Sequence, residues 1–302
     1  MAGDGVCFEE RINREEKTEE RRFCDLHVHS LYSDGENTPE ELAAMGEEMG
    51  LSALALCDHN TVKGLSPFMK AGMGKGLLLV PGVEVTCEFM GKEVHMLGLF
   101  VRENRLREME AYLKQISAFK EESNRTLAEN LKKAGLPVDY AQIKAQAGEG
   151  FINRVHFAKA MVEAGYVSSV PEAFSNYLQE KHGLFVPAKR LDSLEVIDFL
   201  LSVKALPVLA HPFLSLSLEE LLLFLPQAKA RGLGGMETRY AKFTREQTEL
   251  ASALAQRFTL LESGGSDYHG SAKPDIRMGT GRGNLQVPAV FCEKLREQAA
   301  KI

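Results

Sequence analysis

The sequence predicts an α/β fold in which strands alternate with helices and the sheet is mainly parallel. Two observations carry this prediction. Apolar runs of strand length recur on both sides of a long central segment, and each run is separated from the next by an amphipathic stretch bounded by turn or capping residues. Strands that alternate with helices form a parallel sheet, either open or closed into a barrel. The central segment, residues 101–190, has helical periodicity and interrupts the alternation.

Length and composition are those of an ordinary globular protein. The 302 residues are 44% hydrophobic and 26% charged, with a net charge of −6. The acidic balance excludes a basic nucleic-acid coat protein, and no apolar run approaches the ~18 residues that a membrane span needs. The five cysteines are widely spaced and form no CxxC pair. The charged N-terminus has no apolar core of a signal peptide. We therefore expect a reducing, cytoplasmic location without disulfides.

Five strands are expected before the central segment. They are residues 23–26, 52–56, 77–80, 83–89 and 93–100, the last two forming a hairpin across Met90-Gly91-Lys92. A helix between the first two strands has a clear start, because Thr38 and Glu41 form a capping box around Pro39. Gly50 ends that helix.

The β/α alternation returns after Pro187. Strands are expected at residues 207–210, 235–239 and 258–261, and helices at 194–204, 218–230 and 243–257. In the central segment, apolar residues such as Leu113, Ile116, Leu127 and Leu131 recur at helical spacing. This segment holds 14 basic and 11 acidic residues, which is either a mildly basic surface for a polyanion or a chance imbalance.

Six of the eight histidines lie at or beside expected strand ends. They are His27, His29, His59, His95, His211 and His269, and three carboxylates accompany them: Asp34, Glu84 and Asp267. The carboxyl ends of barrel strands converge, and alternate residues of an extended segment face one side. A single strand-end histidine is more often structural. All nine together favour a multinuclear site for Mn, Fe or Zn, and a carboxylate in the apolar strand around Glu84 needs a partner or a cation.

Several motifs together resemble those of the PHP (polymerase and histidinol phosphatase) superfamily. They are Asp25-Leu26-His27-Val28-His29-Ser30, Ser33-Asp34-Gly35, residues 58–64, residues 81–86, Glu93-Val94-His95, Ala210-His211-Pro212 and residues 264–270. The resemblance is strongest to the TrpH/YciV-like branch of metal-dependent phosphoesterases, which includes RNase AM and nucleoside 3′,5′-bisphosphate phosphatases. It implies a distorted (β/α)7 barrel, the PHP fold, with a helical insertion domain.

The expected organisation has three parts, of which the first rests on composition and the other two on the resemblance. Residues 1–22 form a charged N-terminal tail with few apolar side chains to bury. Residues 23–100 and 187–302 form the catalytic barrel, and residues 101–186 form the helical insertion as a substrate cap.

The resemblance also implies two or three divalent metal ions, manganese first, with iron or zinc as alternatives. The first set of ligands would be His27, His29, Glu84 and Asp267; the second Glu84, His95 and His211, with Glu84 bridging; the third Asp34, His59 and His269. No further catalytic residue is assigned, since a metal-activated hydroxide serves as nucleophile. Cys57 and Cys87 are interpreted as small buried residues, and Asp58 either braces a ligand loop or caps a strand end.

Residues 152–158 resemble the branch's Gly-Arg-Pro-His motif. Arg154 and His156 would thus contact a substrate phosphate, although Asn153 and Val155 replace the motif's usual Gly and Pro. Three further cations near the expected rim loops, Lys63, Lys189 and Arg239, are interpreted as solvated charges.

The predicted function is a metal-dependent phosphoesterase, a hydrolase of nucleotide phosphoesters. It would act as a nucleoside 3′,5′-bisphosphate 3′-phosphatase, as a 5′–3′ exoribonuclease that releases 5′-mononucleotides from short RNA, or as both. DNA-specific binding, membrane binding and an obligate protein partner are not expected.

Two alternatives stay open. One is a histidinol-phosphate phosphatase, against which the insertion between His95 and His211 argues. The other is a non-catalytic metal- or nucleic-acid-binding module, although nine strand-end side chains are unlike a closed four-ligand structural site.

Overall fold

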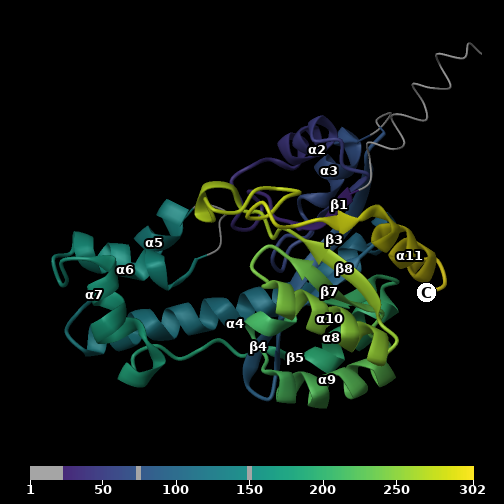
Figure 1. Cartoon of the computed structure of the whole chain (residues 1–302). Coiled ribbons are helices and arrows are strands. Elements are labelled where there is room, and N and C mark those ends of the chain that lie inside the picture. Colours follow the sequence, from purple (N-terminus) through teal and green to yellow (C-terminus); the bar gives the residue numbers. More distant parts are fainter. Residues whose placement is uncertain (1–22, 73–75, 148–151) are drawn as a thin grey trace, which may run out of the picture.

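The computed structural model describes residues 23–72, 76–147 and 152–302 (Figure 1). The tail predicted for residues 1–22 lies outside the described residues. Within them the chain has the predicted α/β architecture, and no helix there combines the length and the apolar character needed to cross a bilayer.

The centre of the molecule is a nine-stranded sheet in the order β8-β7-β6-β4-β3-β2-β1-β9, with β5 paired to β3. The strands are β1 (Phe23–Val28), β2 (Ala53–Leu56), β3 (Leu78–Phe89), β4 (Lys92–Leu99), β5 (Leu191–Asp192), β6 (Leu206–Leu209), β7 (Gly235–Tyr240), β8 (Leu261–Gly265) and β9 (Val287–Pro288). Strand β4 is antiparallel to β3 and β6, while β1-β2-β3 and β6-β7-β8 pair in parallel.

The sheet curls until its two ends meet. The backbone N–H of Asp267, just after β8, donates to the carbonyl of His27 at 2.8 Å, and that of His29 donates to Tyr268 at 3.0 Å. Seven strands thereby form a nearly closed, distorted barrel, as predicted. The closure brings the end of β1 beside the segment that follows β8.

Two strand boundaries differ from the sequence prediction. The runs at 77–80 and 83–89 are one strand, β3, which pairs with β2 up to Pro81 and with β4 from Gly82 onward. Proline is tolerated where the strand changes partner, because its missing N–H interrupts neither ladder. Strand β8 begins at Leu261, not at Phe258. Residues 258–260 instead close the preceding helix, and Thr259 has a φ of 52°.

Helices cover the outside of the barrel. They are α2 (Pro39–Glu48), α3 (Leu65–Ala71), α8 (Ser193–Ser202), α9 (Leu218–Arg231), α10 (Arg245–Arg257) and α11 (Ala289–Ala299). The predicted capping box is confirmed, since the Thr38 hydroxyl accepts from the N–H of Glu41 at 3.1 Å and the Glu41 carboxylate accepts from the N–H of Thr38 at 2.8 Å. These caps satisfy N–H groups that a helix start leaves unpaired.

One long helix connects two hydrophobic cores. Helix α4 (Leu106–Lys133) buries Leu113 in the core of the barrel and Leu127 in a separate core. That second core is formed with α5 (Tyr140–Ala147), α6 (Arg154–Glu163) and α7 (Val170–Ala173). Figure 1 shows these three helices at the far end of α4, standing away from the barrel.

Truncation of Phe157 tests whether the insertion has a core of its own. Its side chain is fully buried between α4, α5 and α6, so Phe157→Ala should cost about 3–5 kcal/mol of local stability. Hydrogen exchange should accelerate in α5–α7 and stay unchanged in β1–β8. Phe68→Ala, which truncates a buried ring in the barrel core, is the control with the opposite pattern. Equal loss of protection in the barrel strands of Phe157→Ala would contradict two separate cores.

Candidate metal centre

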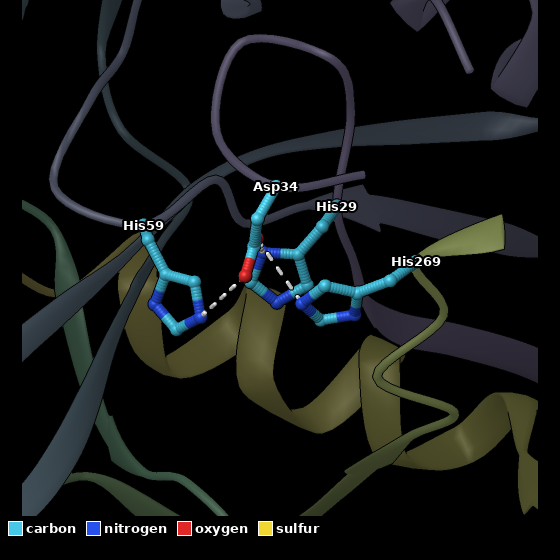
Figure 2. A group of neighbouring side chains, drawn as sticks. All are labelled: His29, Asp34, His59 and His269. Carbon is cyan, nitrogen blue, oxygen red and sulfur yellow. Dashed lines mark ion pairs between the residues drawn. The ribbon is translucent and has the colours of Figure 1, made fainter. Parts of the chain in front are cut away.

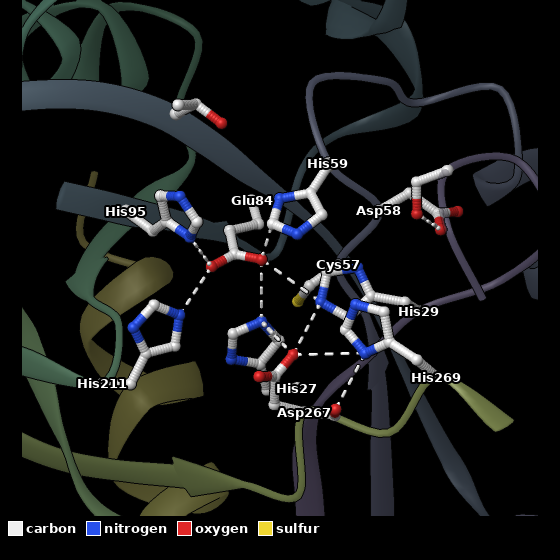
Figure 3. Close-up of polar contacts among 12 residues, drawn as sticks. His27, His29, Cys57, Asp58, His59, Glu84, His95, His211, Asp267 and His269 are labelled. Atoms are coloured by element: carbon white, nitrogen blue, oxygen red, sulfur yellow. Dashed lines mark hydrogen bonds and ion pairs between the residues drawn. The ribbon is translucent and has the colours of Figure 1, made fainter. Parts of the chain in front are cut away.

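The nine predicted ligands come from strand ends and the loops that follow them, and the structure brings them to one end of the barrel, eight of them in Figure 3 and Asp34 in Figure 2. His27 belongs to β1, Glu84 to β3 and His95 to β4. His211 follows β6, and Asp267 follows β8. His29 directly follows β1 in extended chain, and both His27 and His29 face Glu84, as the His-x-His spacing predicts.

Glu84 is the central residue of the site. Its carboxylate is fully buried and is surrounded by five imidazoles. Their nearest ring nitrogens lie 2.7–3.2 Å from a Glu84 oxygen, in His27, His29, His59, His95 and His211. One carboxylate therefore contacts side chains from both halves of the barrel.

A second group lies on the Asp34 side of the centre (Figure 2). His269 Nε2 is 3.1 Å from Asp34 Oδ1, and the rings of His269 and His29 stack with centroids 4.0 Å apart. Asp267 Oδ1 lies 3.2 Å from His29 Nε2. Asp34 is half-exposed at the mouth of the site, whereas Asp267 is buried.

Three sets of these side chains place their ligand atoms within 4.8 Å of one another. The sets are His27, His29, Glu84 and Asp267; His29, Asp34, His59 and His269; and His59, Glu84 and His95. His211 lies outside these sets but keeps its Nε2 3.0 Å from Glu84 Oε1. The implied second set is thus only partly reproduced by this spacing, because His59 and not His211 completes the set with Glu84 and His95.

Buried ring nitrogens test whether the residues fit metal ions. Among the described residues, both ring nitrogens of His29, Nδ1 of His59 and Nε2 of His269 are buried and make no hydrogen bond of good geometry, although carboxylate oxygens lie 3.1–3.2 Å from three of them. An unpartnered buried nitrogen costs free energy, and a divalent cation would satisfy it. Imidazole and carboxylate are also the ligands that Mn, Fe and Zn share. The donor set fits divalent metal ions.

The charges of the site are strongly coupled. Burial alone would raise the pKa of the Glu84 carboxyl, but the imidazoles, His59 foremost, hold it well below its ordinary value. Burial opposes protonation of His95, yet Glu84 raises the pKa of His95 to about 10. Burial lowers the pKa of His59 to about 3. The cluster therefore keeps its carboxylates ionised, and a cation that binds an imidazolium must displace its proton.

Glu237 orients two of the histidines, His27 and His211, and was not assigned from the sequence. Its fully buried Oε1 lies 3.0 Å from His27 Nδ1, and its Oε2 accepts the backbone N–H of His211 at 2.6 Å. Glu84 lies 3.1 Å from the other ring nitrogen, Nε2, so a cation that binds Nε2 would replace the proton there while Nδ1 keeps donating to Glu237. The reasoning that singled out Glu84, a carboxylate within a buried strand, applies equally to Glu237.

Two further side chains hold Asp267. The Tyr240 hydroxyl donates to Asp267 Oδ2 at 2.7 Å, and Lys273 Nζ lies 2.6 Å from the same oxygen. Burial, together with the Asp267 charge, raises the pKa of Tyr240, so its hydroxyl stays protonated as a donor. Sequence reasoning also missed these two residues, since neither has local signs of a polar contact.

Loops around the centre are braced by polar side chains. Asp58 accepts from the N–H and the hydroxyl of Ser30 and from the hydroxyl of Ser33, each at 2.7 Å. These bonds hold the loop that carries Asp34. The side-chain amide of Asn60 accepts from the N–H of Thr86 at 2.9 Å and donates to the Thr86 hydroxyl at 3.0 Å, which fixes the His59 loop to β3.

The two cysteines near the centre are buried, as interpreted from the sequence. Cys57 and Cys87 are fully buried, and burial raises the pKa of each thiol. Each thiol contacts a backbone carbonyl, Leu26 for Cys57 and Val94 for Cys87. A protonated, enclosed thiol is a poor nucleophile.

A hollow of about 440 Å³ lies between the centre and the insertion. Arg154 lines it, with its guanidinium 4.2 Å above the Phe185 ring and one N–H donated to the Leu178 carbonyl. His156 does not line the hollow; its Nδ1 lies 3.2 Å from the N–H of Asn153 and caps α6. Lys189 lines the hollow and lies near the Phe119 ring, whereas Arg239 bonds Ser252 outside it.

Comparisons with known proteins point in one direction. The family model of the PHP domain matches residues 25–179. A 5′-3′ exoribonuclease of Haemophilus influenzae is 32% identical, over 81% of this chain and 89% of that protein. A 3′,5′-nucleoside bisphosphate phosphatase of Chromobacterium violaceum is 28% identical, over 81% and 86%. A solved Bifidobacterium adolescentis structure, assigned as a metal-dependent phosphoesterase, has a TM-score of 0.71 at 27% identity and covers 90% of this chain and 94% of its own.

Replacing Glu237 with glutamine should weaken metal binding without unfolding the barrel. The glutamine amide could donate to His27 Nδ1, which would place the ring proton on Nε2, toward the metal. We expect the affinity for Mn²⁺, measured by equilibrium dialysis, to fall about 10- to 100-fold. Glu262→Gln, on the neighbouring strand β8 and outside the centre, should bind normally. Unchanged Mn²⁺ affinity in Glu237→Gln would show that Glu237 does not orient His27.

Proposed function

The chain belongs to the PHP domain family, and on that premise we propose that it hydrolyses nucleotide phosphoesters next to a 5′-phosphate-bearing nucleotide. It is a metal-dependent phosphoesterase. The proposed substrates are nucleoside 3′,5′-bisphosphates and short 5′-phosphorylated RNA. The observation that supports this choice is the Arg154 guanidinium in a hollow that opens onto the histidine–carboxylate centre.

The proposed cofactors are two or three divalent ions, manganese first. Their proposed ligands are His27, His29, Glu84 and Asp267; Glu84, His95 and His211; and Asp34, His59 and His269. Glu84 is proposed as a ligand shared by two ions, because each of its two oxygens faces imidazoles, Oε2 that of His59 and Oε1 that of His95. Such cations lower the pKa of water and neutralise phosphoryl charge.

The side chains of the site prepare it for this chemistry. Glu84 and Asp267 stay ionised at neutral pH because imidazoles and Lys273 stabilise their negative charge. Glu237 and Tyr240 fix a ligand histidine and a ligand aspartate in one orientation. Most of these groups are buried, so their electrostatic interactions are stronger than in water.

Arg154 is proposed to hold the 5′-phosphate of the substrate. Its fork of N–H donors matches two phosphate oxygens, and the Phe185 ring restricts its orientation. Hydrolysis would break the bond between phosphorus and the 3′-oxygen. Oxygen from water joins phosphorus, the 3′-oxygen takes a proton, and a 5′-nucleotide with a free 3′-hydroxyl leaves.

The first test compares substrates directly. With Mn²⁺, the protein should turn over adenosine 3′,5′-bisphosphate or a 5′-phosphorylated RNA pentamer, measured as phosphate or mononucleotide release, in preference to histidinol phosphate. Asp267→Ala should reduce turnover to background, because it removes a ligand and leaves buried imidazoles unbalanced. Turnover of histidinol phosphate alone would overturn the proposal, as would normal activity of Asp267→Ala.

Arg154→Ala tests the phosphate contact. If Arg154 binds the 5′-phosphate equally in ground and transition states, its loss should raise KM about tenfold or more and leave kcat nearly unchanged. Arg154→Lys should recover part of the loss through charge alone. Arg107→Ala, an exposed arginine at the start of α4, is the matched control. A fall in kcat with unchanged KM would contradict this role.

A further inference from the structure

A second hollow, of about 360 Å³, lies beside the first and also reaches the metal centre. It shares His59, Asn60, Lys120 and Asn124 with the first hollow, so the two adjoin both at the centre and along α4. One wall is a single face of α4, where lining residues recur every three or four positions from Glu110 to Asn124. The opposite wall includes Tyr32 and Lys63, from the loops that follow β1 and β2.

This second hollow is more basic than acidic. Four lysines line it, Lys63, Lys114, Lys120 and Lys144, against the two glutamates Glu110 and Glu121. Lys144 Nζ lies 3.1 Å from Glu121, but Arg125 lies 2.9 Å from the same carboxylate. Lys144 can therefore turn to another anion while Glu121 keeps a cation.

Two of these lysines are also largely accessible. The side chains of Lys114 and Lys144 are 73% and 50% exposed, and the contact of Lys114 with Glu110 is long, at 3.7 Å. Exposed pairs of this kind contribute little to stability. Exchange of such a partner for a phosphate oxygen has little cost, so the wall suits a phosphodiester backbone.

Tyr32 adds an aromatic surface to the rim. The residue is 37% exposed although it belongs to the loop that carries Asp34. The ring lies close to Gly64, where an added Cβ would be 3.1 Å from Tyr32 Cδ2. An exposed aromatic ring beside a basic groove is the arrangement by which proteins stack the bases of single-stranded nucleic acid.

A substrate that is a single nucleotide would not occupy the second hollow. A nucleoside bisphosphate needs the metal centre for one phosphate and Arg154 for the other, both in the first hollow. A chain that continues beyond the cleaved phosphodiester must leave the centre by another route. The second hollow begins at the metal-centre residue His59 and offers stacking and positive charge along that route.

We propose that the second hollow binds the nucleotide that follows the cleaved phosphodiester of single-stranded RNA, with its base on Tyr32 and its backbone along Lys63, Lys114 and Lys144. This inference rests on the proposed function and names oligoribonucleotides as its substrate class. Hydrolysis at the 3′-oxygen would leave the phosphate on this second nucleotide. The shortened chain then carries the 5′-phosphate that Arg154 binds in the next round.

The test separates the two substrates. Tyr32→Ala and the double variant Lys114→Ala/Lys144→Ala should hydrolyse adenosine 3′,5′-bisphosphate with kcat/KM within about twofold of wild type. Their kcat/KM on a 5′-phosphorylated RNA pentamer should fall about tenfold. In the lysine variant, the salt dependence of RNA binding should also flatten by roughly 1 to 2 in logarithmic slope. The double variant Lys132→Ala/Lys133→Ala removes the same charge from the exposed end of α4 and should resemble wild type.

Binding is measured alongside, by fluorescence anisotropy of a labelled, hydrolysis-resistant phosphorothioate RNA pentamer. Equal losses on both substrates, or no loss on either, overturn the RNA subsite. A wild-type protein that hydrolyses the bisphosphate but not RNA also overturns it, while the proposed function stands. If wild type hydrolyses no nucleotide, the proposed function fails. Pentamer binding then decides the subsite, and unchanged binding in the variants refutes it.

Discussion

The carboxylate of Glu84 imposes the constraint around which the rest of the site is arranged. It is fully buried, and an ionised carboxylate without a compensating positive charge costs on the order of several kcal/mol in the protein interior. Five imidazoles, carried by β1, β4 and the segments that follow β1, β2 and β6, supply the compensation at 2.7–3.2 Å. Because they crowd around one group, their positive charges also repel each other, and this adds to the burial that lowers the pKa of His59. Divalent cations relieve both problems, since they balance the carboxylates and leave the imidazoles neutral.

This arrangement requires an unusual backbone at the strand ends. Asn60, His211 and Asp267 have positive φ angles of 53°, 23° and 56°, backbone values that residues other than glycine rarely adopt. Each is held by bonds already described: Asn60 to Thr86, the N–H of His211 to Glu237 and the N–H of Asp267 to His27. Strained residues persist only when their surroundings determine them so fully, and here all three adjoin or belong to the ligand set.

Local signals predicted the alternation of strands and helices and placed the candidate ligands at strand ends, whereas the resemblance to a known family implied the closed barrel. The spacing of His27 and His29, the capping box at Thr38 and the apolar run of β2 each depend on a few neighbouring residues. The misplaced start of β8 also has a local cause, since Phe258 and Leu260 flank Thr259 like residues of a strand. Glu237 and the second hollow were missed because their meaning lies in distant partners. Lys63 and Lys144 are 81 positions apart and become neighbours of one groove only after folding.

Helix α4 explains how chemistry and substrate choice can be separated in one chain. Its first half is buried in the barrel core through Met109, Leu113 and Ile116, and its second half in the insertion core through Leu127 and Leu131. Across its 28 residues, about 42 Å, the helix is continuous, so the walls of both hollows keep a fixed distance from the barrel. The predicted ligands all belong to the barrel, whereas Arg154 and most of the basic side chains of the hollows belong to the insertion. Changes on the exposed faces of the insertion can therefore alter which phosphate ester is held without moving a ligand. A change to Glu84 or Glu237 would disturb every substrate alike.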